Sequence, residues 1–488
     1  MGKFYITTTL PYVNAEPHIG FAMEIIKADV IARYHRARGD EVIFNTGTDE
    51  HGVKIYRTAI EQNKNPQEYV DEYAAKFGEL KSLLNVSYTH FIRTSDPDHK
   101  KAAQEFWRLC AARGDIYKKS YRIRYCVGCE LEKTDSELTD GACPIHPNLK
   151  LELLDEENYF FRFSKYQQPL LDFYEAHPDF VLPSFRFHEI KRFVADGLQD
   201  FSISRIKAKM PWGVPVPDDD EQVMYVWFDA LINYISTLGW PDDVKGEFQN
   251  FWPGTQIAGK DNLRQQSAVW EAMLMSAGLP LSKQILIHGF ITVNDKKMSK
   301  SLGNVIAPKA LVEKYGTDPV RYYLLREIPS GEDGDFSYEK FEQRYNGDLA
   351  NGLGNLVARV ATLGEKVSPT AVHGEGDIEK EIRTEIDRVR ALYEKSLHEF
   401  RLNESLGHAW ELISFADKYI NDKKPWTIKD DRDQFSRVVA NACYIVDAVR
   451  KLIQPFLPKT AEKIREQIAL SDAEIVVKKA GNLFPRLG

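Results

Sequence analysis

This sequence of 488 residues contains no long apolar run, and its few cysteines are not distributed as in a disulfide-rich protein. No stretch approaches the roughly 20 consecutive apolar residues of a membrane-spanning helix, so we expect no membrane partner. The chain enters a strand-like segment directly, without the basic region and apolar stretch of a secretory leader. Only five cysteines occur. Three lie in one loop, which favours a reducing, cytoplasmic location over a disulfide framework.

A net positive charge is also missing, because 72 acidic residues outnumber 64 basic ones and give a net charge of −8. This balance argues against a protein that is coated with nucleic acid over its whole surface. It leaves room for a local basic face, since phosphate binding depends on where the lysines lie. At this length the chain is expected to bury several hydrophobic cores.

The amino-terminal part shows an alternation of strand-like and helix-like segments. Apolar residues 4–8 and 41–45 read as strands. Each precedes a segment whose apolar residues recur every three or four positions, as on one face of a helix. The first helix is expected to end at Gly39 and the second to begin near Pro66. This alternation predicts an α/β fold with a Rossmann-like parallel sheet.

The alternation is interrupted and later resumed, which predicts five segments. Residues 1–116 and 221–290 are expected to form the two halves of the Rossmann-like domain, with later strands at 223–228, 256–258 and 284–290. Residues 117–220 are expected to form an insertion between these halves, and residues 291–346 a loop and linking region. Residues 347–488 are predicted to form an all-α helix bundle, with helices over 382–400, 406–420 and 435–456.

A cysteine cluster lies within the insertion. Two residues separate Cys126 from Cys129, and two separate Cys143 from His146. Three thiolates and one imidazole at this spacing can surround Zn²⁺ as a tetrahedron. Four unrelated buried residues are the alternative, but this loop contains little apolar material that could bury them. We therefore predict one zinc ion, which is structural because protein ligands fill all four positions.

Two short motifs follow apolar strands in the two halves of the sheet. The first, Pro17-His18-Ile19-Gly20, opens a helix, and the second is Lys297-Met298-Ser299-Lys300-Ser301. The carboxyl ends of parallel strands share one edge of a sheet, so both loops can reach one site. Backbone N–H groups at a helix start and two flexible ammonium groups suit a polyphosphate. The pair resembles the signature of class I aminoacyl-tRNA synthetases, which activate an amino acid with ATP.

Further segments resemble one family of that class, the methionyl-tRNA synthetases. Residues 10–14, 47–52, 225–230 and 259–261 match in order, and the resemblance covers essentially the whole chain. The insertion is too short for the large editing domain of the leucyl, isoleucyl and valyl relatives. The resemblance implies ATP-dependent conversion of methionine to methionyl-AMP and its transfer to the 3′ end of tRNA(Met). Mg²⁺ would accompany the ATP.

The resemblance also assigns a methionine site. Asp49 would bind the substrate ammonium group. Aromatic rings suit the thioether, because sulfur against a ring edge gains roughly 0.3–1.5 kcal/mol. Gln266 stands where the family commonly has a histidine and would replace its hydrogen bonds. The side-chain pocket would be formed by Leu10, Tyr12, Trp227, Ala230 and Tyr234.

For ATP, the resemblance implies that His18 and Gly20 approach the phosphates and ribose. Lys297 and Lys300 would stabilise charge on the α-phosphate and on the leaving pyrophosphate. No enzyme nucleophile is needed, because the methionine carboxylate attacks directly, so catalysis is mostly positioning and electrostatics. The residues that would border the adenosine are Gly259 and Asp261.

Within the helical segment, Asn355, Arg359 and Trp426 resemble the anticodon-reading residues of this family. A polar pair can reach base edges and an indole can stack on an unpaired base. By sequence alone, the two polar residues are merely one helical turn apart, and Trp426 could belong to a core. No appended carboxyl-terminal tRNA-binding domain is visible, so we expect a monomer.

Two alternatives stay open. One is a non-catalytic RNA-binding paralogue, supported by Gln266 and by Phe21, which occupies the fourth position of the His-Ile-Gly-His signature. The other is a sister class I synthetase for another amino acid. The two lysines of the Lys-Met-Ser-Lys-Ser segment, His18 and Asp49 favour the enzyme for methionine.

Overall fold

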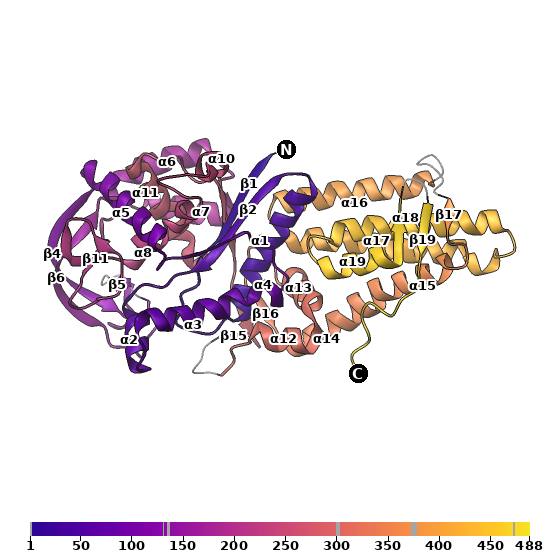
Figure 1. Cartoon of the computed structure of the whole chain (residues 1–488), viewed down its shortest axis with the longest axis horizontal. Helices are drawn as coiled ribbons and strands as arrows, with labels where there is room; N and C mark the ends of the chain where they lie inside the picture. The colour runs from indigo at the N-terminus through magenta and orange to yellow at the C-terminus, as the bar shows by residue number, and fades with distance from the viewer. Residues whose placement is uncertain (1, 130, 134–136, 299–302, 372–377, 472–473) are drawn as a thin grey trace. The chain divides into compact units, whose positions relative to one another are not determined.

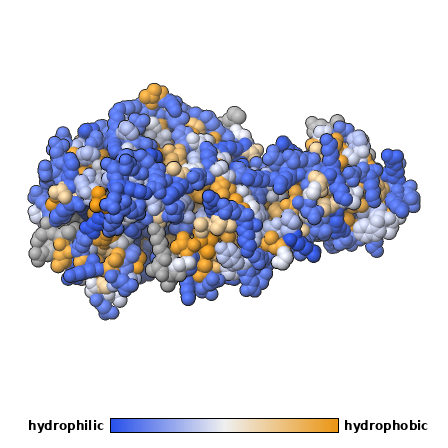
Figure 2. All heavy atoms as spheres, turned by 60° about the horizontal axis from the view of Figure 1, so that its bottom comes forward, coloured by the Kyte–Doolittle hydropathy of each residue, from blue (hydrophilic) through white to orange (hydrophobic). Residues whose placement is uncertain are grey.

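The computed structural model describes residues 2–129, 131–133, 137–298, 303–371, 378–471 and 474–488. Contacts divide the chain into two compact units (Figure 1). Unit 1 consists of Met1–Pro17, His35–Lys81 and Ser87–Ile287, and unit 2 consists of His18–Tyr34, Ser82–Val86 and His288–Gly488. Within the described ranges, no helix is long and apolar enough to cross a membrane. The face shown in Figure 2 is mostly hydrophilic, with apolar side chains in small groups.

A six-stranded sheet forms the centre of unit 1. Strand β1 runs parallel to both β2 and β12, and β13 runs parallel to β7. The order reverses between β1 and β12, which creates the switch point where doubly wound sheets bind ligands. The predicted Rossmann-like α/β fold is confirmed. In spatial order the strands are β3 (His90–Arg93), β2 (Glu41–Thr48), β1 (Lys3–Thr8), β12 (Thr255–Gly259), β13 (Gln284–His288) and β7 (Val181–Leu182).

The sheet is buried on both faces, which explains why its strands read as continuous apolar runs. All residues of β12 are buried, as are all residues of β2 after the first. Helices α5 (Pro97–Ala112) and α11 (Trp270–Ala277) contribute aromatic rings to the core. The ring of Phe106 stacks on that of Trp270, with the centroids 5.6 Å apart.

The strand predicted over residues 223–228 is wrong in extent and in sheet. Strand β11 (Asp219–Met224) pairs antiparallel with β9 (Ser204–Ile206) and β10 (Pro215–Val216), outside the central sheet. Helix α8 (Val226–Ala230) begins two residues after β11 ends. A short apolar run fits a buried strand and a buried helix equally well, so periodicity could not separate them.

The insertion contains a long antiparallel hairpin. Strand β4 (Ile116–Cys126) pairs with β6 (Glu152–Phe161), and β5 (Leu131–Lys133) and β8 (Phe201–Ser202) complete this four-stranded sheet. Helices α6 (Gln167–Ala176) and α7 (Ser184–Ala195) follow. Cys126 is the last residue of β4, so the cysteine cluster lies in the connection between the two long strands.

Unit 2 is mainly helical, as predicted. Helices α16 (Lys380–His398), α17 (Leu402–Lys423) and α18 (Arg432–Ile453) pack side by side (Figure 1). They correspond to the three predicted bundle helices, with ends shifted by a few residues. The unit also contains a small antiparallel sheet of β17 (Thr370–Ala371), β18 (Ile468–Leu470) and β19 (Glu474–Val477). Further helices of the unit include α12 (Pro308–Tyr315), α13 (Thr317–Arg326), α14 (Tyr338–Arg344), α15 (Asn355–Gly364) and α19 (Pro458–Gln467).

Helix α1 (Ile19–Ala37) is held in unit 2 by a buried ion pair. Asp29 Oδ2 lies 2.8 Å from Arg321 Nη2, and both side chains are 0% exposed. The guanidinium group also donates to the backbone oxygens of Leu84, Pro455 and Phe456. Residues 18–34 therefore belong by contact to the helical unit, although they follow β1 in sequence.

This geometry predicts a loss of stability in Arg321→Ala, because the buried Asp29 would keep only Arg33 as a cation and three buried backbone oxygens would lose their donor. Removing one partner of a buried pair typically costs about 3–5 kcal/mol. Urea unfolding followed by circular dichroism would measure it. Lys314→Ala is the matched control, since the Lys314–Glu342 pair is exposed and such pairs contribute about 1 kcal/mol or less. Equal losses in the two variants would contradict the prediction.

Candidate active site

Loops at the carboxyl ends of β1 and β2 pair with each other in unit 1. The N–H of Asp49 donates to the oxygen of Pro11 at 3.0 Å, and the N–H of Val13 donates to the oxygen of Asp49 at 3.2 Å. Tyr12 and Asp49 thereby form a short parallel bridge. Asp49 is buried, whereas Leu10 and Tyr12 are half-buried. The structure thus brings the predicted ammonium ligand next to a predicted wall of the methionine pocket.

The carboxylate of Glu50 anchors the loop that carries Asp49. Its two oxygens accept hydrogen bonds from Arg93 at 2.7 and 2.9 Å and from the hydroxyl of Ser95. The indole of Trp212 donates to the backbone oxygen of Glu50 at 2.6 Å. Charge-assisted bidentate bonds of this kind are strong and directional. The backbone of the neighbouring Asp49 is consequently held from both sides.

Helices α8 and α9 (Asn233–Ser236) carry three other predicted pocket residues. Trp227 and Ala230 are three residues apart on α8 and share one helical face. Tyr234 on α9 is 2% exposed and its ring packs at 5.8 Å from that of Trp270. The indole N–H of Trp227 is buried and has no hydrogen-bond partner among the described residues. Because buried polar groups are normally paired, a bound ligand could supply the partner of this N–H.

The segment after β12 carries the remaining predicted residues of unit 1. Gly259 ends the strand and is buried, whereas Asp261 is exposed in a 3₁₀ turn over Lys260–Asn262. A π-helical turn, Gln265–Val269, follows. Gln266 is 2% exposed, and its amide oxygen has no hydrogen-bond partner among the described residues. A polar ligand could satisfy this oxygen through its own N–H or O–H.

The two signature motifs approach each other within unit 2. The N–H of Ile19, the first residue of α1, donates to the oxygen of Ile306 at 3.0 Å. A Cβ atom placed on Gly20 would lie 2.9 Å from His18 Cε1 and 3.6 Å from Met298 Cε. Gly20 therefore permits a close approach that a larger residue would block. Burial lowers the pKa of His18, which keeps its imidazole neutral at pH 7.

The second signature motif begins in a hairpin of β14 (Ile291–Val293) and β15 (Lys296–Lys297), next to β16 (Gly334–Phe336). The side chain of Lys297 is exposed. Its Nζ lies 5.9 Å from the centroid of the Phe290 ring, and its backbone oxygen accepts from Asn304 at 3.1 Å. Lys300, the other predicted catalytic lysine, lies outside the described residues.

The four predicted metal ligands come together in the insertion. The ligand atoms of Cys126, Cys129, Cys143 and His146 all lie within 4.8 Å of one another. Cys129 Sγ is 3.2 Å from His146 Nδ1 and 3.5 Å from Cys143 Sγ. Ligand bonds to zinc of about 2.0–2.3 Å give tetrahedron edges of roughly 3.3–3.8 Å. The donor set and its spacing therefore fit one zinc ion.

The three predicted anticodon-binding residues lie in unit 2. Trp426 is 51% exposed, in a 3₁₀ turn over Pro425–Thr427, so it is not a core residue. Asn355 is exposed at the start of α15. Arg359 on α15 donates to Asp417 and to Asn421 on α17, both at 2.8 Å. These two bonds fix the orientation of its guanidinium group.

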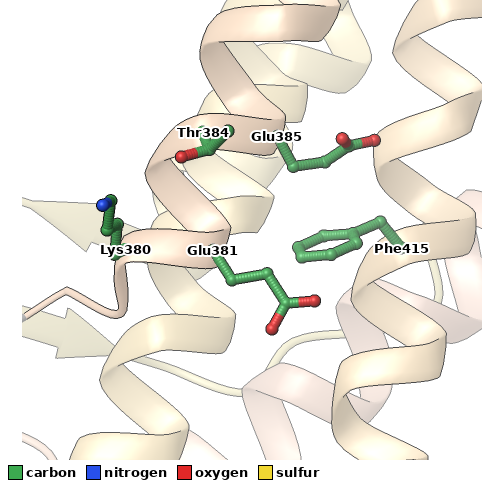
Figure 3. Close-up of a pocket in the computed structure, with 5 residues that line it drawn as sticks. All are labelled: Lys380, Glu381, Thr384, Glu385 and Phe415. Carbon is green, nitrogen blue, oxygen red and sulfur yellow. The ribbon is translucent and has the colours of Figure 1, made fainter.

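A separate cavity of about 410 Å³ lies in the helical unit. Glu381 and Glu385 from α16 and Phe415 from α17 extend into it, and Lys380 and Thr384 complete its lining (Figure 3). None of the residues predicted from the sequence lines this cavity. The cavity is therefore separate from the predicted site.

Sequence reasoning missed the charged side chains next to the predicted methionine-pocket residues, above all Glu50 and Asp229. Both are completely buried. A signal was present, because each acidic residue stands next to a predicted pocket residue, Asp49 or Ala230, in an apolar or glycine-rich segment. A buried carboxylate must find partners, and this requirement could have marked both positions.

Comparisons with known proteins agree with this geometry. The family model for class I tRNA synthetases (M) matches residues 4–152 and 136–361, and the model for the anticodon-binding domain of tRNA ligase matches residues 379–480. The methionine–tRNA ligase of Thermotoga maritima is 43% identical over 484 residues, which cover 96% of this chain and 76% of the relative. That of Thermosynechococcus vestitus is 44% identical over 497 residues, covering 99% and 92%.

Solved structures lead to the same family. The methionyl-tRNA synthetase of Mycobacterium tuberculosis in complex with methionyl-adenylate has a TM-score of 0.94 and 36% identity, with 100% of both chains covered. Its free form has a TM-score of 0.85 and 34% identity, with 100% of this chain and 99% of that chain covered. Neither the non-catalytic paralogue nor a sister synthetase is supported by these matches. The chain belongs to the methionyl-tRNA synthetases, the class I enzymes that join methionine to tRNA with ATP.

Proposed function

We propose that this chain performs the family's two-step reaction with the residues predicted above. Methionine is bound in unit 1, by Asp49 at its ammonium group and by the aromatic pocket at its thioether. The observation that carries this proposal is the pair of buried polar atoms, Trp227 Nε1 and Gln266 Oε1, that lack protein partners among the described residues. The five free thiols suit a reducing cytoplasm. We also propose that the protein acts as a monomer.

In the first step, a carboxylate oxygen of methionine attacks the α-phosphorus of ATP. A new P–O bond forms while the bond to the bridging oxygen breaks, and pyrophosphate leaves with that electron pair. His18, Gly20, Lys297 and Lys300 bind the phosphates and stabilise the developing charge. Mg²⁺, when bound with ATP, supplies further neutralisation of the phosphate oxygens. In the second step, a hydroxyl at the tRNA 3′ end attacks the methionyl carbonyl carbon and AMP leaves.

Lys300→Ala tests the charge stabilisation. We expect adenylate formation to slow about a hundredfold or more, because the ammonium group acts mainly in the transition state. Methionine affinity should stay nearly unchanged. Pre-steady-state adenylate formation and methionine titration would measure both quantities. Lys296→Ala removes an exposed lysine of β15 and serves as control. A collapse of methionine affinity with a normal rate would show that the role is misassigned.

The tRNA anticodon is bound by the helical unit in this proposal. The exposed indole of Trp426 stacks on an unpaired base, and Asn355 and Arg359 reach base edges. The bonds from Arg359 to Asp417 and Asn421 leave its side chain already oriented, which reduces the entropy lost on binding.

Trp426→Ala should therefore reduce aminoacylation efficiency by roughly ten- to a hundredfold, since stacking on an aromatic ring is worth about 1–3 kcal/mol. Methionine-dependent ATP–pyrophosphate exchange should stay near normal, because that reaction needs no tRNA. Phe185→Ala removes another exposed ring, from the insertion, and controls for loss of an aromatic surface. If Trp426→Ala charges tRNA(Met) normally, the anticodon assignment is wrong.

We further propose that the Cys126, Cys129, Cys143 and His146 cluster binds one structural Zn²⁺. The close approach of the knuckle to its imidazole requires a glycine, because a Cβ atom on Gly128 would lie 2.6 Å from His146 Cγ. Closed sites of this kind stabilise a fold and keep no position open for substrate.

Metal analysis should find one zinc ion per chain in the wild type and none, or much less, in Cys129→Ser. A chelator should lower the melting temperature of the wild type, because binding free energy contributes to folding. Cys443→Ala is the control, since this buried cysteine of α18 lies outside the cluster. Wild-type protein without zinc, together with an unaltered melting temperature in Cys129→Ser, would refute the site.

A further inference from the structure

A buried carboxylate, Asp229, lies between two histidines in unit 1. Asp229 and His99 are 0% exposed and His51 is 1% exposed. Asp229 Oδ2 is 2.6 Å from His51 Nδ1, and Asp229 Oδ1 is 2.9 Å from His99 Nε2. The other ring nitrogen of His99 lies 2.9 Å from the hydroxyl of Ser236. The three ionisable groups thus form one hydrogen-bonded chain inside the protein.

The protonation of this chain follows from the carboxylate. Burial alone would raise the pKa of Asp229, but the nearby His51 and His99 lower it to about 2. An ionised carboxylate only accepts hydrogen bonds, so His51 must carry a proton on Nδ1 and His99 must carry one on Nε2. Both bonds involve a charged acceptor and are therefore short and strong.

The two histidines connect Asp229 to different parts of the unit. His51 lies two residues after Asp49, in the loop that follows β2. Asp229 lies on α8 between Trp227 and Ala230. The bond between His51 and Asp229 therefore joins the proposed ammonium-binding loop to the helix of the proposed thioether pocket. His99 lies on α5, which carries no residue of the proposed site.

We infer that His51 and Asp229 are positioning residues for methionine: their bond sets the separation between Asp49 and the Trp227–Ala230 face. This inference rests on the proposed methionine-binding roles of those residues. Methionine presents its ammonium group and its thioether at a fixed distance within one small molecule. A displacement of about 1 Å between two binding groups can reduce a rate a hundredfold. A hydrogen bond to a buried charged acceptor is short and strong, so it holds the two elements at a defined separation.

The loop does not depend on His51 alone. Glu50 stays bound to Arg93 and Ser95, and Trp212 donates to its backbone oxygen. The ring of Trp212 also packs edge-on at 5.5 Å from that of His51. Loss of the His51 bond should therefore shift the loop without unfolding it. Variants at this position are suitable for a functional test.

The two histidines provide a matched experiment, because each donates one hydrogen bond to the same carboxylate. His51→Leu and His99→Leu are compared in methionine-dependent ATP–pyrophosphate exchange, with melting temperatures measured alongside. We expect His51→Leu to raise the methionine KM about tenfold or more, with the ATP KM changed less than about twofold. His99→Leu should lower the melting temperature while it changes the methionine KM less than about threefold.

His51→Asn supplies a rescue, because its amide nitrogen can replace Nδ1 as donor; its methionine KM should lie within a few-fold of wild type. If a leucine variant fails to fold, the methionine KM values of Asp229→Asn and His51→Asn are compared instead. Asp229→Asn should then show the larger value. Equal KM shifts at His51 and His99, or a lower melting temperature of His51→Leu at normal KM, would overturn the inference. Absence of methionine-dependent exchange in the wild type would instead refute the proposed function.

Discussion

The pairing of β1 with β12 is the contact on which the candidate methionine site depends. These strands run parallel with Ile6 opposite Thr255, and the ladder continues from the N–H of Thr9 to the oxygen of Ile257. The approach is so close that a Cβ atom on Gly254 would lie 2.2 Å from Tyr5 Cδ1. The hydroxyl of Tyr5 in turn donates to the oxygen of Tyr234. One strand pair therefore fixes both the switch point and a wall of the proposed pocket.

Buried carboxylates form the second level of this organisation. Desolvation of a charge costs several kcal/mol unless partners compensate for it, so each buried carboxylate forces several elements into one arrangement. Glu50 brings together β2, β3 and the loop of Trp212, and Asp29 connects α1 with Arg321. Asp229 connects α5 with α8 and with the loop after β2. Proposed functional residues stand beside Glu50 and Asp229, so stability and positioning use the same bonds.

Local patterns were sufficient to predict the central strands β1, β2, β12 and β13, the bundle helices and the grouping of the four metal ligands, but not the short strands β3 and β7. Apolar periodicity revealed α16 to α18, and ligand spacing in two short pairs revealed the cluster. Patterns failed where partners are distant in the chain. His51 and Asp229 are 178 positions apart, and no local rule indicates that they meet. The helical start of α8 was missed because a short apolar run suits either structure, and the two residues of β17 are too few for any periodicity to appear.

Two π-helical turns show why the polar positions were hardest to predict. Gln265–Val269 contains Gln266, and Tyr345–Gly354 ends directly before Asn355. A π-turn bonds residue i to i+5, so it accommodates an extra residue and rotates the side chains that follow relative to those that precede it. A prediction that assumes 3.6 residues per turn therefore assigns these side chains to the wrong face of the helix. The first segment contains a residue to which we assign a ligand contact, and the second directly precedes one. Departure from regular geometry at functional positions is expected, because the polar group must face a ligand and not the core.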